Sequence, residues 1–276
     1  MKKQIVKVKN IFFLLLAVLV ILCFYFFPIY WIFTTALKPP LETFRLPPKF
    51  FFKPMGGNFI YIFKRTDFLL LAKNSIIVAT GSMLLSIFLS LPAAYSLSRF
   101  RIKNKNNIAF MILTLKMFPP IAVVLPFFIM YRAIGLYDTV FGLMLLYTAF
   151  NIPLATWLLI GFIKEIPVSI EESALIDGAS YIQIFQRIVL PLVSVGLMAT
   201  GILCFIMSWN EFLLALILTG RNQTLPVFIY SFINFREIKW GQLMAAAVIM
   251  TSPIIISSIF IRKYLIRGLT FGAVKE

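Results

Sequence analysis

The chain has 276 residues, is 61% hydrophobic and has a mean hydropathy of +0.96, whereas a soluble domain is roughly 45–50% apolar. It contains no histidine, which excludes histidine-based acid–base catalysis, Ser-His-Asp triads and histidine metal sites. Its net charge of +16 is spread between apolar segments and not gathered in one basic patch, so it indicates membrane topology and anionic lipid, with no nucleic acid partner.

The first apolar segment follows the basic stretch MKKQIVKVKN. It continues past Cys23 to about Trp31 without a small-x-small cleavage site, so we expect a retained membrane span and not a signal peptide. Cys23 and Cys204 each lie inside an apolar run, which argues against a disulfide framework.

Counting about 20 apolar residues per span, the sequence predicts an all-α integral membrane protein with six spans. The fifth segment is long enough to tilt or break. The predicted spans are Ile11–Thr34, Ile76–Leu97, Ile108–Tyr131, Val140–Phe162, Val189–Leu218 and Leu243–Ile261.

The charges between the spans predict the orientation. Lysines and arginines gather in the N-terminal stretch, in SRFRIKNKNN after the second span, and at the C-terminus, which places both termini in the cytoplasm of a multi-pass cell-membrane protein. The segment Lys38–Asn74 opposes this orientation, because it would lie outside and is also basic. It is long and rich in proline, and we expect it to fold as a small external layer.

Polar residues inside the spans are candidates for a translocation path or gate, because polar groups in hydrocarbon face a cavity or another helix. Lys116 precedes Pro119-Pro120, a pair that should bend or break the third span. Three interpretations of Lys116 stay open: pairing with Glu211, snorkelling, or facing the path. Asn151 is part of a polar side of the fourth span, for which helix packing is the ordinary explanation.

Trp209-Asn210-Glu211 lies inside the long fifth segment, and Glu211 is the only acid within a predicted span. Tryptophan beside polar hydrogen-bonding groups suits stacking on a carbohydrate. A structural hydrogen bond, or a helix end at the interface, explains the same residues equally well.

The loop between the fourth and fifth spans reads EESALIDGASYIQIFQRIVLPL from Glu171 to Leu192. Pro167 should end what precedes it, and Ser169 with Glu172 has the spacing of a capping box. Glu171 and Glu172 are then expected in the first helical turn, where the helix dipole favours acids.

Gly178 is expected to end this short helix at a positive φ, and Ser180 with Gln183 forms a second capping box. Pro191 should interrupt the second helix near the bilayer surface. The expected apolar face of that helix consists of Ile182, Phe185, Ile188 and Val189. A well-capped connector explains this loop, and so does a docking surface on which small residues admit a partner and exposed acids orient it.

The spacing of residues in this loop favours a docking surface over a simple connector. Glu172-Ser173-Ala174, three residues, Gly178, nine residues and Ile188-x-Leu190-Pro191 resembles the E-A-A-x3-G-x9-I-x-L-P loop of binding-protein-dependent ABC transporter permeases, with Ser173 in place of the first alanine. Four further stretches resemble the carbohydrate-uptake branch, in particular the maltose-type second permease subunit. They are NSIIVA (Asn74–Ala79), AAYSLSRF (Ala93–Phe100), SWNEFLLALIL (Ser208–Leu218) and the tail RGLTFGAVKE (Arg267–Glu276).

The resemblance implies one permease domain over 1–276, with an extra N-terminal span at 1–35, a permease core at 70–266, the coupling loop at 163–191 and a cytoplasmic tail at 267–276. It implies no catalytic residue. The residues expected to couple to the ATPase, with the exposed acids contacting it, are Glu171, Glu172, Ser173, Ala174, Asp177, Gly178, Ala179, Leu190 and Pro191.

The partners implied are a dimer of ATP-binding subunits, a second permease subunit, an extracytoplasmic solute-binding protein and the lipid bilayer. The sequence has no G-x-x-x-x-G-K-[ST] loop, so no cofactor is expected on this chain, and ATP and Mg²⁺ belong to the ATPase. No metal site is expected.

The resemblance therefore predicts the permease subunit of an ABC importer for a sugar or sugar-like solute. Two alternatives stay open: a self-sufficient secondary transporter, for which Glu211 and Lys116 are the only coupling-ion candidates, and an ABC permease for a non-sugar solute. An integral-membrane enzyme is opposed by the missing histidine and by the absence of clustered inward carboxylates.

Overall fold

The structure is a computed structural model that describes residues 2–43, 45, 47–233 and 238–271. Within these ranges it is nearly all helical, with one isolated antiparallel bridge between Ile233 and Ile238. The chain divides into two compact units, Met1–Asp67 with Ile229–Ser252, and Phe68–Phe228 with Pro253–Glu276. The end of the predicted tail, residues 272–276, lies outside the described residues.

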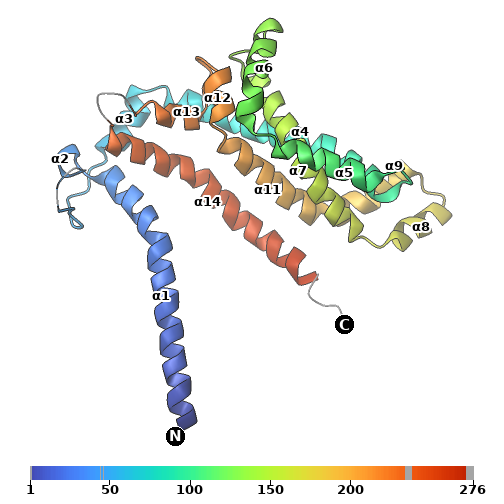
Figure 1. The fold of residues 1–276 in the computed structure, drawn as a ribbon, viewed down its shortest axis with the longest axis horizontal. Helices are drawn as coiled ribbons and strands as arrows, with labels where there is room; N and C mark the ends of the chain where they lie inside the picture. Colours follow the sequence, from blue (N-terminus) through green and yellow to red (C-terminus); the bar gives the residue numbers. More distant parts are fainter. Residues whose placement is uncertain (1, 44, 46, 234–237, 272–276) are drawn as a thin grey trace. The chain divides into compact units, whose positions relative to one another are not determined.

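The first unit begins with the long helix α1 (Lys2–Leu37), seen at the blue end of the chain in Figure 1. No residue of its most apolar window is buried within the protein, and a helix that is apolar all round needs lipid or a partner as its solvent. The predicted first span therefore lies inside a single helix. The short helix α2 (Pro40–Thr43), α3 (Gly57–Arg65) and the beginning of α14 (Trp240–Phe271) complete this unit.

The segment after α1 folds around Lys38. The Lys38 ammonium lies 4.7 Å from the centre of the Trp31 ring and 5.4 Å from that of Phe52, a cation–π arrangement. The Asn58 side chain donates to the Ala36 carbonyl at 2.8 Å. The segment that we expected to form a small external layer is thus held to the end of α1.

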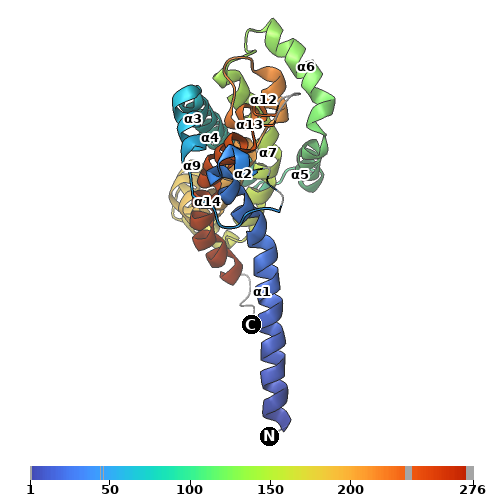
Figure 2. The ribbon, with the colours of Figure 1, turned by 90° about the vertical axis from the view of Figure 1, so that its left-hand side faces the viewer.

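Three helices form the centre of the second unit: α4 (Phe68–Arg99), α7 (Val140–Lys164) and α11 (Ser194–Trp209). They lie side by side in Figures 1 and 2. Ser82, Ser86 and Ser90 follow one face of α4 and are fully buried, because small side chains let helix backbones approach closely. The Ser90 hydroxyl donates across the contact to the Ile152 carbonyl of α7 at 3.3 Å.

Among the described residues, four helices are long and apolar enough to cross a membrane, and two bent helix pairs raise the number to six if each pair is one span. The first pair joins α5 (Lys105–Thr114) and the turn η1 (Leu115–Met117) to α6 (Pro120–Ala133) with an 85° bend. Since Pro119 and Pro120 lie at this bend, the predicted effect of the proline pair is confirmed.

The predicted fifth segment, Val189–Leu218, is broken, as its length allowed, and does not form one helix. Helical residues 181–192 bend by 73° into α11. The chain breaks again after Trp209, before α12 (Leu213–Leu218), and α13 (Leu225–Tyr230) follows. The second break is stable because the Glu211 carboxylate accepts the backbone N–H groups of Leu214 and Ala215 at the start of α12.

Asp138 fastens the connection between α6 and α7 to the loop after α12. Its carboxylate accepts the backbone N–H groups of Gly220, Arg221 and Asn222 at 2.8, 3.0 and 2.9 Å. Partial burial raises the pKa of Asp138, but these three hydrogen bonds and the Arg221 charge outweigh burial, so its pKa lies below the ordinary value.

We expect Asp138→Ala to release this loop, because three N–H donors lose their only charged acceptor. Trypsin should then cut after the exposed Arg221 several times faster than in the wild-type protein. The lowered pKa means that the carboxylate stabilises the fold fully above about pH 5 and loses its effect as the pH falls below about 4. The pH dependence is measured by thermal unfolding of the wild-type protein and of Asp138→Ala: a stability difference between them that does not shrink below about pH 4 would contradict this account.

Candidate functional site

The loop between α7 and α11 forms a projection of two helices at one end of the second unit (Figure 1). The first helix, α8, spans Val168–Ile176, and the second starts with α9 (Tyr181–Ile184). The predicted capping box at Ser169 is wrong, because α8 begins already at Val168, after Pro167, with no side-chain cap. Only Glu171 lies in its first turn.

The turn at Gly178 has the geometry predicted from the sequence. Gly178 has φ +83°, and its N–H donates to the Leu175 carbonyl while that of Ala179 donates to the Ala174 carbonyl, at 3.0 and 2.9 Å. These two bonds define a Schellman ending, for which glycine is the preferred residue. The capping box of Ser180 with Gln183 is also present, with both reciprocal bonds.

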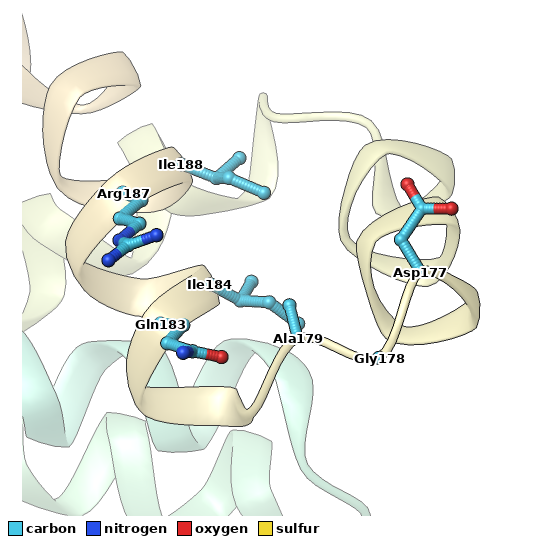
Figure 3. A pocket seen from close by; sticks show the side chains of 7 residues that line it. All are labelled: Asp177, Gly178, Ala179, Gln183, Ile184, Arg187 and Ile188. Atoms are coloured by element: carbon cyan, nitrogen blue, oxygen red, sulfur yellow. The ribbon is translucent and has the colours of Figure 1, made fainter.

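The turn borders a hollow of about 330 Å³ between the two helices. Figure 3 shows Ala179, Ile184 and Ile188 directed into it, with Asp177 on the α8 side and Arg187 on the other. The residues that line it are Asp177, Gly178, Ala179, Gln183, Ile184, Arg187 and Ile188. An apolar floor between an acid and a base can bind a complementary protein surface.

The second helix continues through a wide π-helical turn, η2 (Phe185–Val189), into α10 (Leu190–Leu192). Pro191 explains the wide turn, because its ring has no N–H and clashes with the carbonyl four residues earlier. Ile184 and Val189 are buried, whereas Ile182 is 69% exposed. The predicted apolar face therefore included Ile182 wrongly and left out Ile184.

Glu171 is the only buried residue of α8. Its carboxylate accepts the Arg99 Nε–H at 2.6 Å and the Tyr95 hydroxyl at 3.0 Å. The expectation that the acids of this loop are exposed is therefore wrong for Glu171 and correct for Glu172, which is exposed along with Ser173, Asp177 and Gly178. Contact of Glu172 with the ATPase stays a prediction. Ala174 and Ala179 are half-buried, and Leu190 and Pro191 are exposed.

A second candidate site is a cavity of about 80 Å³ between η1, α6, α7, α11 and α12. It brings together Lys116, Asn151 and Glu211 from the predicted set. The Lys116 ammonium donates to the Phe150 carbonyl at 3.1 Å, and neither ion pair within the described residues joins it to Glu211.

Glu211 and Asn151 also have structural roles. The Glu211 carboxylate accepts the Tyr147 hydroxyl at 2.8 Å besides the N–H groups of α12. The Asn151 amide donates to the Ser208 hydroxyl at 2.8 Å. The interpretation of Asn151 as a helix-packing residue is thus supported, and Glu211 both ends a helix break and lines the cavity.

Trp209 and Asn210 do not line this cavity. The Trp209 ring is 2% exposed and stacks on Phe205 with 5.7 Å between ring centres. Asn210 is exposed and donates to the Ile206 carbonyl. Trp209 is thus unavailable for stacking on a sugar in this conformation.

Sequence reasoning missed Tyr95, Arg99 and Ser208 as parts of the two sites, whereas Tyr147 belongs to the polar side of the fourth span that the sequence predicted. Tyr95 and Arg99 stand in the quoted stretch AAYSLSRF, where Arg99 served only as an orientation charge. An arginine and a tyrosine four residues apart at a predicted span end were the available signal, because they share one helix face.

The chain is similar in sequence to known transport proteins. Residues 86–271 match the family model described as "Binding-protein-dependent transport system inner membrane component". The chain is 40% identical over 206 residues to the trehalose/maltose transport system permease protein MalG of Thermococcus litoralis, covering 74% of each chain. It is 36% identical over 254 residues to the trehalose transport system permease protein SugB of Mycobacterium tuberculosis, covering 90% of this chain and 92% of that one.

The fold is similar to that of a chain in the crystal structure of a bacterial alginate ABC transporter in complex with alginate pentasaccharide-bound periplasmic protein. The TM-score is 0.64 at 17% sequence identity, over 90% of this chain and 92% of that one. At this identity the likeness concerns the fold alone.

Proposed function

Since the chain belongs to the family of binding-protein-dependent transport system inner membrane components, the permease subunits of ABC importers, we propose that its cargo is a sugar or a sugar-like solute. It is a transport subunit and not an enzyme. Trehalose, maltose and diacetylchitobiose stand in the names of similar permeases that are 32–40% identical to it. That agreement supports a carbohydrate cargo over the non-sugar alternative.

The projection at Gly178 is proposed to couple this permease to its ATPase, and the exposure of α8 is the observation that carries the proposal. Every residue of α8 other than Glu171 is exposed or half-buried. Its exposed apolar side chains include Ile176 at 87%, Val168 at 50% and Ile170 at 42%. Apolar residues exposed together on a polar loop mark a protein-binding surface.

On this proposal six spans cross the cell membrane, each bent pair counting as one, and both termini lie in the cytoplasm. The extra span at 1–35 precedes a core at 70–266, and the coupling loop occupies 163–191. The partners are a dimer of ATP-binding subunits that holds ATP and Mg²⁺, a second permease subunit and an extracytoplasmic binding protein.

The cavity with Lys116, Asn151 and Glu211 is proposed to lie on the translocation path, with Trp209 and Asn210 next to it as part of a gate. Pockets that hold small ligands measure about 300–1,000 Å³, so a cavity of about 80 Å³ admits no sugar in this conformation. The path must therefore widen through helix movement or be shared with the second permease subunit.

The proposal predicts sugar transport by proteoliposomes that contain this chain, its second permease subunit and the ATPase. Uptake should require ATP inside and sugar-loaded binding protein outside, because access reverses only when the ATPase closes. The solute that the binding protein retains identifies the cargo. Uptake by the purified chain alone, driven by an ion gradient without ATP, would establish the secondary transporter instead.

A further inference from the structure

The buried contact between Glu171 and Arg99 lies where the coupling projection meets the helical body. Arg99 is the last residue of α4, and Glu171 is in the first turn of α8. The exposed fractions of the two side chains are 9% and 7%. Tyr95, one turn earlier on α4, donates to the second oxygen of the same carboxylate.

Arg99 also joins the end of α7. One terminal nitrogen of its guanidinium donates to the carbonyls of Ile163 and Ile166, at 2.9 and 2.8 Å. Ile163 lies in the last turn of α7 and Ile166 follows its C-cap, at a helix end that lacks internal donors and favours a positive charge. One guanidinium therefore connects α4, α7 and α8.

Apolar packing holds α8 only through partly buried side chains, such as Ala174 against the core. None of its apolar residues is buried; Glu171 alone is. Two apolar surfaces can slide past each other. A charge-assisted hydrogen bond has a fixed geometry, so it resists movement of α8 both toward and away from α4 and α7. The planar arginine fork has the shape for several such bonds at once, which a lysine cannot reproduce.

We propose that Glu171, Arg99 and Tyr95 form a joint that passes movement of the coupling projection to α4 and α7. This inference rests on the proposed coupling role of α8 and adds how the movement enters the spans. Glu171 and Arg99 are then positioning residues: they touch neither ATP nor the solute, and act through the helices that they connect. The joint predicts that weakening the pair separates ATP hydrolysis from transport.

The test uses the complete reconstituted transporter with Glu171→Gln, which keeps the shape and the acceptor oxygen but removes the charge. We expect the amount of solute transported per ATP hydrolysed to fall about tenfold, the size of losing one charge-assisted bond. ATPase co-purification should be unchanged. Arg99→Lys should give the same separation, and Tyr95→Phe a smaller one, because it removes one hydrogen bond and no charge.

Asp67→Asn is the control, since Asp67 is an exposed acid of the first unit that lies outside both the coupling loop and the joint. It should leave the transport ratio unchanged. An unchanged ratio in both Glu171→Gln and Arg99→Lys overturns the joint, and so does loss of the ATPase from these complexes, which would show that the pair only builds the docking surface. A failure of the coupling proposal itself can be told apart from a failure of the joint, because only the former predicts normal uptake with Gly178→Asp.

Discussion

We expect Gly178→Asp to lower solute uptake about 100-fold or more, while the protein reaches the membrane in normal amount. The backbone penalty is small: a non-glycine residue at a positive φ costs about 1–2 kcal/mol, and a Cβ at Gly178 meets no atom within 4 Å. The protein therefore folds. The added carboxylate instead stands on the exposed turn between α8 and α9, where a partner must approach closely and would have to desolvate it.

The chain offers a matched control in Gly135. It lies in the loop after α6 with φ +73°, and a Cβ there also meets nothing within 4 Å. Gly135→Asp therefore adds the same strain and charge at a site that belongs to neither candidate site, and uptake should stay within about twofold. Radiolabelled sugar uptake and ATPase co-purification measure both variants. Equal losses in the two would show that strain, and not docking, causes the defect.

Features with a local cause could be predicted from the sequence. The bend at Pro119 follows from a ring that cannot continue a helix, and the turn at Gly178 follows from the backbone that a Schellman ending demands. The capping box at Ser180 depends only on Gln183, three residues later. The capping box predicted at Ser169 is wrong for an equally local reason: the helix already begins after Pro167, so Ser169 lies inside it.

Features that depend on distant residues could not be predicted. Glu171 and Arg99 are separated by 72 positions, so charge counting assigned one to a partner surface and the other to membrane orientation. Similarly, hydropathy placed Glu211 inside the fifth segment without showing how its charge is satisfied. Its carboxylate accepts N–H groups of α12 and the Tyr147 hydroxyl of α7, so it does not need water. The burial of the Glu171 carboxylate and the hydrogen bond between Tyr147 and Glu211 both come from tertiary contacts that no sequence window contains.

We expect a second large effect on solute uptake from reversing the charge of Glu211 in the small cavity. Glu211→Lys would place a second ammonium beside Lys116 in a space of about 80 Å³, and it would also remove the acceptor of the α12 N–H groups. We expect uptake to fall about 100-fold, as a few kcal/mol of like-charge repulsion in a partly dry site would cause. Glu211→Gln keeps an acceptor for Tyr147 and should lower uptake only about threefold.

Lys116→Met separates a path from a purely structural cavity. Methionine fills a similar volume and gives up one hydrogen bond, to the Phe150 carbonyl, so thermal unfolding should change little. If solute passes Lys116, the variant changes the rate of transport or the preference among neutral and acidic sugars, while ATPase co-purification stays normal. Asp67→Lys, a charge reversal at an exposed residue of the first unit, controls for general effects of charge. Wild-type rates and preferences with Lys116→Met, together with lower thermal stability of Glu211→Lys, would assign this cavity to helix packing and leave the path to the partner subunit.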